Sequence, residues 1–263
     1  MPCGGCVVKP LAIDLFCGLG GWTDGLLAEG YEVIGFDIER HHYGDHHYPA
    51  QLVLQDVLTL HGSQFKDAAL IVASPPCQAY SYRAMPWKRA KALGPPCNAL
   101  FDACFRIQQE ACAAAGKHIP LIVENVRGAQ PWVGRSRWNY GSFHLWGDVP
   151  ALMPATKTAK VPGLNWSGSD KPGYVARAFN TTAEQQGRKN TGGSWFKIAH
   201  NTTSGHGRNP DGRNDRVWMR DPVAATASKS KARKAASAHI AKIPFPLAQY
   251  IAATFRPPAS ETR

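Results

Sequence analysis

The stretch LAIDLFCGLGG, residues 11–21, decides the fold. Leu11–Phe16 has strand length and is apolar except for Asp14, and three glycines follow within residues 18–21. Glycines allow a tight turn and let a ligand approach the backbone closely. Residues 22–29 have helical character, which Gly30 ends. The stretch therefore predicts a strand, a glycine-rich turn and a helix.

The segment after this turn predicts a nucleoside-cofactor half-site. Residues 31–36 form a second segment of strand length, in which Glu32 is the one charged residue, and Asp37 follows it. An acidic residue about 20 positions after a glycine turn is placed to bind a pair of ribose hydroxyls. The turn lacks the third, more distant glycine of a dinucleotide fingerprint. A nicotinamide dinucleotide is therefore disfavoured.

The rest of the pattern predicts an α/β fold. Short apolar runs at 52–54, 70–73, 120–123 and 143–146 predict further strands. Residues 98–115 carry apolar side chains three to four positions apart, which is typical of a helix. The segment 235–255 is apolar and mostly helical, so we expect it to return to the first domain.

Polar residues that follow these strands are candidates for chemistry. Two prolines in the stretch SPPCQ, residues 74–78, end a strand and stiffen the loop that presents Cys77. A thiol on such a loop is a candidate nucleophile, although most cysteines are simply buried. Glu124 ends another strand and is a candidate general acid. Asp56 is placed either to accept from an adenine amino group or to cap a helix.

The positive charge of the chain is concentrated in one segment. The formal net charge is +11, and residues 155–235 hold 15 Lys/Arg against 5 Asp/Glu. Such a local excess is typical of a polyanion partner, most often nucleic acid. A solvated basic surface and a mobile linker are the alternatives.

Several classes of protein are disfavoured by the sequence. No apolar run approaches the roughly 18–20 residues that span a membrane, and the N-terminus lacks the pattern of a signal peptide. The seven cysteines suit a reducing cytosol better than a disulfide framework. Cys3 and Cys6, and the histidines of 41–47, lack further ligands at suitable spacing. We therefore expect no metal site, and an exposed helix or loop at 41–47.

With these residues in place, the chain resembles the C5-cytosine-specific DNA methyltransferase family of bacterial or phage type. Residues 14–21 match its cofactor turn, Asp37 its ribose-binding acid and Asp56 its adenine contact. PPCQ at 75–78 matches the catalytic loop, and ENV at 124–126 the catalytic glutamate motif. The resemblance implies a Rossmann-like, S-adenosylmethionine-dependent methyltransferase fold with a small, irregular target-recognition lobe. The implied domains are 1–154 for cofactor and catalysis, 155–235 for target recognition, and 236–263 for a returning helix.

The resemblance also implies site residues. The catalytic set is Cys77, Glu124, Arg135 and Arg137. The cofactor-binding set is Asp14, Phe16, Gly18, Gly20, Gly21, Asp37, Ile38, Asp56, Val57, Pro75 and Lys242. Two departures stand out: the gap between Glu124 and Arg135 is shorter than usual, and the Gly-Asn of the closing motif reads Ile240-Ala241, with Lys242 next.

The implied reaction is transfer of a methyl group from S-adenosylmethionine to C5 of cytosine in duplex DNA. Cys77 would attack C6 of a base flipped out of the duplex, and Glu124 would stabilise the charge at N3. The paired arginines would help to hold the base's O2 and the glutamate. Lys242 raises the alternative of a carboxylated S-adenosylmethionine that would give 5-carboxymethylcytosine.

Other functions remain open at this point. They are cytosine-C5 methylation of RNA, an inactive DNA-binding relative and a dinucleotide oxidoreductase. The expected partner is double-stranded DNA, with no membrane, and the expected location is the cytoplasm of a bacterium or a phage-infected host. A phage or restriction-modification setting follows from the resemblance. We expect a monomer, with an oligomer left open.

Overall fold

The computed structural model describes residues 8–43, 45–80, 95–153, 163–164, 174–175, 238–239 and 241–258. The chain divides into two compact units, one of Met1–Thr156 with Ile243–Arg263 and one of Lys157–Lys242. In the second unit, the strands β10 (Gly163–Leu164) and β11 (Tyr174–Val175) pair in parallel. Most of the predicted target-recognition lobe lies outside the described residues, so its role and the boundaries at 154 and 235 stay predictions.

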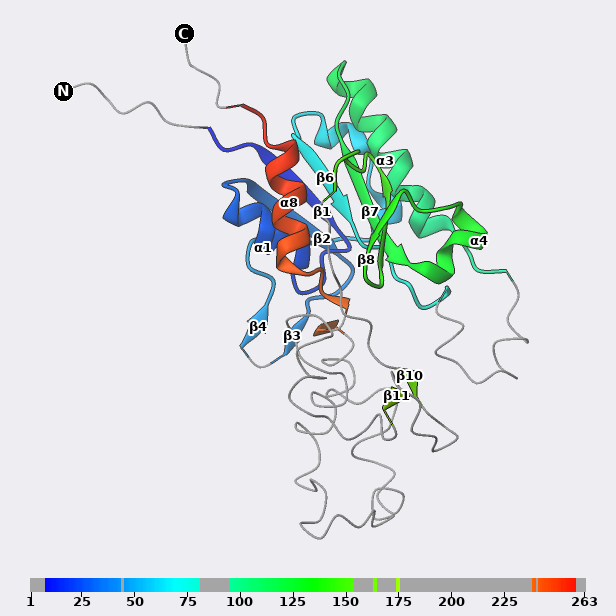
Figure 1. Cartoon of the computed structure of the whole chain (residues 1–263). Coiled ribbons are helices and arrows are strands. Elements are labelled where there is room, and N and C mark those ends of the chain that lie inside the picture. The colour runs from blue at the N-terminus through cyan, green and yellow to red at the C-terminus, as the bar shows by residue number, and fades with distance from the viewer. Residues whose placement is uncertain are drawn as a thin grey trace, which may run out of the picture. The chain divides into compact units, whose positions relative to one another are not determined.

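The first unit is built on a seven-stranded, mostly parallel sheet of order β5-β2-β1-β6-β7-β9-β8 (Figure 1). The parallel strands are β1 (Leu11–Leu15), β2 (Glu32–Asp37), β5 (Gln51–Leu54), β6 (Leu70–Ala73) and β7 (Leu121–Val126). β9 (Phe143–Gly147) runs antiparallel to β7, and β8 (Trp138–Tyr140) antiparallel to β9. The predicted α/β, Rossmann-like class is confirmed.

Helices cover both faces of this sheet. α1 (Gly21–Ala28) and α8 (Phe245–Phe255) lie side by side on one face, and α3 (Ala99–Ala115) lies on the other (Figure 1). Side chains alternate between the two resulting cores because successive strand residues point to opposite faces. In β7, for example, Ile122 belongs to the α1–α8 core and Val123 to the α3 core. Strands buried on both faces explain the continuous apolar runs in the sequence.

The C-terminal helix packs closely on the first helix. A Cβ added to Gly25 of α1 would lie 2.4 Å from the backbone carbonyl carbon of Ala248, so only glycine permits this approach. The hydroxyl of Tyr31 donates to the carbonyl of Ala252 at 3.0 Å. Pro244 is the N-cap residue of α8 and Pro246 lies in its first turn, where proline is well tolerated.

Two predicted local structures differ from those observed. Glu124 lies inside β7 because pairing with β9 continues to Val126, opposite Phe143. The expected helix or loop at 41–47 is wrong: His42–Tyr43 (β3) and His46–His47 (β4) form an antiparallel pair. No group of three potential metal-binding residues occurs within the described ranges.

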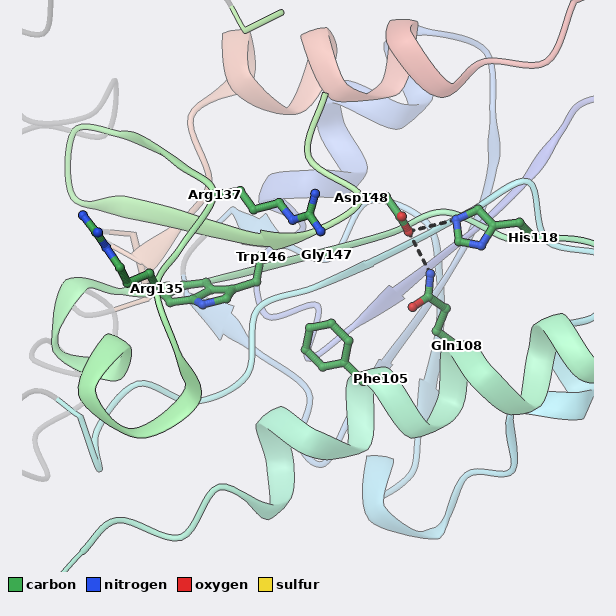
Figure 2. Close-up of a pocket in the computed structure, with 8 residues that line it drawn as sticks. All are labelled: Phe105, Gln108, His118, Arg135, Arg137, Trp146, Gly147 and Asp148. Carbon is green, nitrogen blue, oxygen red and sulfur yellow. Dashed lines mark hydrogen bonds and ion pairs between the residues drawn. The ribbon is translucent and has the colours of Figure 1, made fainter. Parts of the chain in front are cut away.

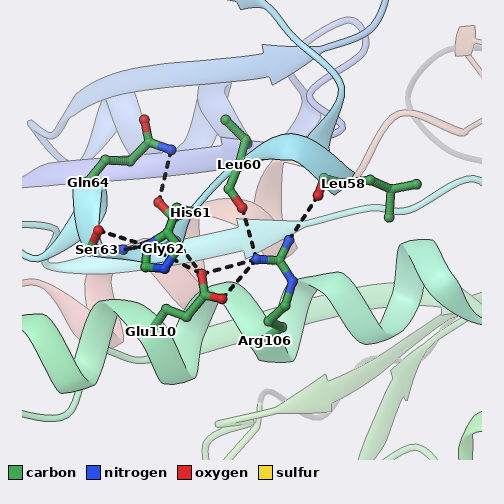
Figure 3. Close-up of polar contacts among 8 residues, drawn as sticks. All are labelled: Leu58, Leu60, His61, Gly62, Ser63, Gln64, Arg106 and Glu110. Atoms are coloured by element: carbon green, nitrogen blue, oxygen red, sulfur yellow. Dashed lines mark hydrogen bonds and ion pairs between the residues drawn. The ribbon is translucent and has the colours of Figure 1, made fainter.

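A polar cluster joins α3 to the connection between β5 and β6 (Figure 3). This connection contains the 3-10 helices η1 (Val57–Thr59) and η2 (Gly62–Phe65). Arg106 donates to the carbonyl of Leu60 at 2.9 Å and pairs with Glu110 at 3.0 Å. Glu110 accepts from the backbone N–H of Gly62 at 2.6 Å. The cluster fixes the segment that directly follows Asp56.

The described helices include none that is both long enough and apolar enough to span a membrane. Five cysteines are described, namely Cys17, Cys77, Cys97, Cys104 and Cys112, and none of them is in a disulfide.

Candidate active site

The glycine turn after β1 has a backbone that other sequences would not easily adopt. Phe16, Gly18 and Gly20 have φ values of 58°, 51° and 74°, the left-handed region that glycine tolerates best. A Cβ on Gly20 would lie 2.5 Å from Cδ of Pro49. Gly20 is the N-cap residue of α1 and, lacking a side chain, makes no side-chain capping hydrogen bond.

Asp37 ends β2 and connects it to this turn. Its Oδ2 accepts from the N–H of Gly18 at 2.9 Å, and its Oδ1 accepts from the N–H of Glu39 at 3.2 Å. The imidazole of His41 lies 3.6 Å from Oδ1. Burial raises the pKa of Asp37, but hydrogen bonds from His41, Gly18 and Glu39 outweigh it and hold the pKa below its usual value. An ionised carboxylate at a strand end suits a ribose diol.

A buried network that the sequence analysis missed lies behind the turn. The hydroxyl of Thr23 donates to Oδ2 of Asp14 at 2.6 Å and lies 2.8 Å from the hydroxyl of Tyr48. Oδ1 of Asp14 is buried and has no partner among the described residues. Burial raises the pKa of Asp14 to about 7. An unpartnered carboxylate oxygen here fits a ligand that carries a cationic donor, as the methionine part of S-adenosylmethionine does.

The two interpretations of Asp56 are compatible. Oδ1 accepts from the N–H of Leu58 at 3.0 Å and caps η1, which leaves Oδ2 to accept from an adenine amino group. Val57 is buried beneath it, whereas Ile38 is 74% exposed beside Asp37. An exposed apolar side chain next to two acidic strand ends is suited to cover an adenine ring.

The loop that carries Cys77 is tied to two strands. The N–H of Ser74 donates to the carbonyl of Leu15 at 3.1 Å, and the buried side-chain amide of Asn125 donates to the carbonyl of Pro75 at 3.0 Å. The N–H of Tyr80 closes the turn on the carbonyl of Cys77 at 3.0 Å. The Cys77 side chain is half-buried. β7 therefore positions the thiol loop as well as Glu124.

Glu124 is a buried carboxyl group at the same end of the sheet. It is 8% exposed, and burial raises its pKa to about 8, although a hydrogen bond from the Ser74 side chain lowers it in part. Ala73 pairs with Val123 in the parallel register, so the next residues, Ser74 and Glu124, are also neighbours. A carboxyl group that stays protonated at neutral pH can donate a proton.

Arg135 and Arg137 lie elsewhere. Both are exposed, and they line a pocket of about 330 Å³ beside α3 (Figure 2). Arg135 points away from the other labelled side chains in that view. The pocket is on the α3 side of the sheet with Trp146, whereas Glu124 alternates with Val123 and faces the α1–α8 side. The described structure therefore does not bring these arginines to Glu124. The other lining residues are Phe105, Gln108, His118, Gly147 and Asp148.

Some predicted positions lie in the second unit or outside the described residues. Lys242 is the last residue of the second unit, so its role at a cofactor stays a prediction. Cys3, Cys6 and Ile240 lie outside the described residues.

With this geometry in place, the comparisons with known proteins identify the domain. Residues 11–130 match the family model of C-5 cytosine-specific DNA methylase. This part of the chain is a C-5 cytosine-specific DNA methylase domain. The match includes the glycine turn, Asp37, Asp56, the Cys77 loop and Glu124. The predicted family is confirmed, and the methylase family implies S-adenosylmethionine as cofactor.

Solved structures similar to the methylase domain match only part of their own length. A protein named as a DNA modification methyltransferase encoded within an E. coli prophage is 24% identical with a TM-score of 0.35, over 48% of this chain and 35% of that one. Dnmt2 of S. pombe is 17% identical with a TM-score of 0.32, over 47% and 36%. EhMeth of Entamoeba histolytica is 13% identical with a TM-score of 0.32, over 48% and 41%. The chain thus spans about a third of the length of the prophage protein. No curated protein matches the sequence.

Proposed function

We propose that the methylase domain transfers a methyl group from S-adenosylmethionine to C5 of cytosine in duplex DNA through a covalent bond between Cys77 and C6. One observation carries the proposal. Cys77 lies in the loop that follows β6, and the buried Glu124 lies in the adjacent parallel strand β7, one residue beyond the Ala73–Val123 pair. The thiol loop is also tied to Asn125, the residue after Glu124.

The chain's residues account for each step at the base. The Cys77 thiolate forms a bond to C6, and the electron pair of the C5–C6 bond moves toward N3 and C5. Glu124, held protonated by burial, donates a proton to N3 and stabilises the charge pushed into the ring. S-adenosylmethionine supplies the methyl group that C5 accepts. Loss of the C5 proton to solvent then re-forms the C5–C6 double bond and expels the Cys77 thiolate, and N3 returns its proton to the Glu124 carboxylate. The base must leave the duplex because C6 is inaccessible within the stack.

The cofactor would be held along the ends of β1, β2 and β5. Asp37 would accept from the ribose hydroxyls, and Oδ2 of Asp56 from the adenine amino group. Ile38 and Val57 would contact the adenine ring, and the turn of Phe16, Gly18, Gly20 and Gly21 would approach the remainder. Asp14 would accept from the cationic end through Oδ1. Pro75 lies in the Cys77 loop beside this region, and Lys242 remains the proposed carboxylate partner.

The substrate and the transferred group are tested together. Purified full-length protein is incubated with S-adenosylmethionine and either duplex DNA or RNA, and the nucleosides are analysed by mass spectrometry. We expect 5-methylcytosine in the DNA reaction alone. Product in RNA alone would favour the RNA alternative. The Lys242 alternative is tested by expressing the protein in cells that supply a carboxylated cofactor, where a carboxymethyl product in the DNA would support it. Unmodified cytosine in every reaction would contradict the proposal.

The position of Arg137 gives a prediction that departs from the resemblance. We expect Arg137→Ala to change kcat by less than about threefold, because its side chain lies on the sheet face opposite to Glu124. Lys66→Ala, which removes one exposed positive charge elsewhere, is the matched control. A loss of about 10²–10³ in kcat would show that Arg137 contacts the reacting base after all.

A further inference from the structure

We propose that Ser74 is a positioning residue for Glu124 and that the indole N–H of Trp22 holds Ser74 in the required orientation. The catalytic part of this inference rests on the proposed function.

The three residues come from neighbouring elements. Trp22 lies in α1, is 2% exposed, and donates from Nε1 to Oγ of Ser74 at 3.0 Å. Ser74 directly follows β6, and its backbone is fixed by the bond from its N–H to the carbonyl of Leu15. Glu124 lies in β7, one residue beyond the Ala73–Val123 pair. The Ser74 hydroxyl is therefore between a buried donor and a buried carboxyl group.

The chemistry of the indole determines the direction of the Trp22–Ser74 hydrogen bond. An indole N–H only donates, so Oγ of Ser74 must accept from Trp22. The single proton of the Ser74 hydroxyl is then available for a carboxyl oxygen of Glu124. When Ser74 donates to one carboxyl oxygen, that oxygen is occupied as an acceptor and the acidic proton resides on the other one. Ser74 would thus select which oxygen of Glu124 gives its proton to N3 of the base.

Among the described residues around Glu124, no charged side chain competes with Ser74 for its carboxyl group. Leu145 of β9 is opposite Glu124, and the neighbouring His144 contacts Ser136 at 2.8 Å. β6 leads to Ser74 and the Cys77 loop, and α1 contributes Trp22. The pKa of Glu124 has two causes, burial, which raises it, and Ser74, which lowers it. Removal of the Ser74 hydroxyl should therefore change the pKa of Glu124 through the loss of this one contact.

The test measures the titration of Glu124 and the rate in the same variants. Ser74→Ala removes the donor to the ionised carboxylate, so the pKa of Glu124 should rise, by about 1 unit. The basic limb of the kcat profile should move to higher pH by the same amount, while kcat at pH 7 falls about tenfold because the proton is less well placed. Trp22→Phe should cause a smaller change in the same direction. Ser74→Thr keeps a hydroxyl and should restore both values.

Direct titration separates this inference from the proposed function. The pKa is read by NMR of ¹³C-labelled glutamate carboxyl groups, with the Glu124 signal assigned by its loss in Glu124→Gln. Ser63→Ala, which removes an exposed hydroxyl, is the control, and unfolding midpoints show that the variants fold. An unchanged pKa in folded Ser74→Ala overturns the inference. A raised pKa with an unchanged kcat profile overturns its catalytic part. An inactive wild type overturns the proposed function, while the NMR titration still decides whether Ser74 positions Glu124.

Discussion

Cys77→Ser is expected to abolish product formation, with 5-methylcytosine below detection in DNA that the wild-type protein modifies. A serine hydroxyl has a far higher pKa than a thiol and lacks the general base that would activate it in this role. The fold should persist because the Cys77 side chain is only half-buried and the loop is held by hydrogen bonds with the backbone of Leu15 and Tyr80 and the side chain of Asn125. Nucleoside mass spectrometry measures the loss.

A covalent trap separates a missing nucleophile from a damaged binding site. When fluorine replaces the C5 hydrogen, the proton whose loss would release Cys77 is absent, so the bond between sulfur and C6 should persist. We expect a denaturation-stable complex with fluorinated duplex DNA for the wild type and for Cys97→Ala, which removes an exposed thiol. Cys77→Ser should form none. A stable complex in that variant would assign the covalent bond to another residue.

Glu124→Gln is expected to lower kcat by about 10²–10⁴, because glutamine cannot give a proton to N3. Burial raises the pKa of Glu124 to about 8, so the wild-type carboxyl group is protonated at neutral pH. Wild-type activity should therefore fall as the pH rises through about 8. Glu32→Gln removes an exposed carboxyl group at the start of β2, the end opposite to Asp37, and should leave the dependence of activity on pH unchanged.

The same substitution should alter stability in a direction that the pKa determines. The carboxyl group ionises near 4.5 when unperturbed and near 8 in the folded protein, so the folded state binds more protons between these values. Folding stability from Glu124 is thus greatest at low pH and is lost as the pH rises toward 8. Glu124→Gln should unfold at a higher denaturant concentration than the wild type at pH 8, with a smaller difference at pH 5. Equal shifts at both pH values would contradict burial of an ionisable group.

Much of the candidate site was predictable because its signals are local. The segments 11–15 and 70–73 have the length and the largely apolar character of strands, and the glycines at 18–21 favour a tight turn. In a parallel sheet, the carboxyl ends of strands meet along one edge. Asp37, Cys77 and Glu124 could therefore be assigned to one site before any tertiary structure was considered.

The sequence could not establish which side chains meet across that edge. The Asp14–Thr23–Tyr48 network joins residues 9 and 25 positions apart. The contact between Trp22 and Ser74 spans 52 positions. Such contacts depend on strand register and on how α1 packs, and neither property is encoded in a local pattern.

The sequence by itself determined the order of strands and turns, the polar residues at their ends and hence the family. The tertiary structure alone decided which face each side chain occupies. Arg135 and Arg137 were grouped with Glu124 by motif, yet they line the α3 side of the sheet. A shift of one residue in strand register reverses the face, and register is fixed by pairing with distant strands. For the same reason, only the folded sheet placed Ser74 next to Glu124.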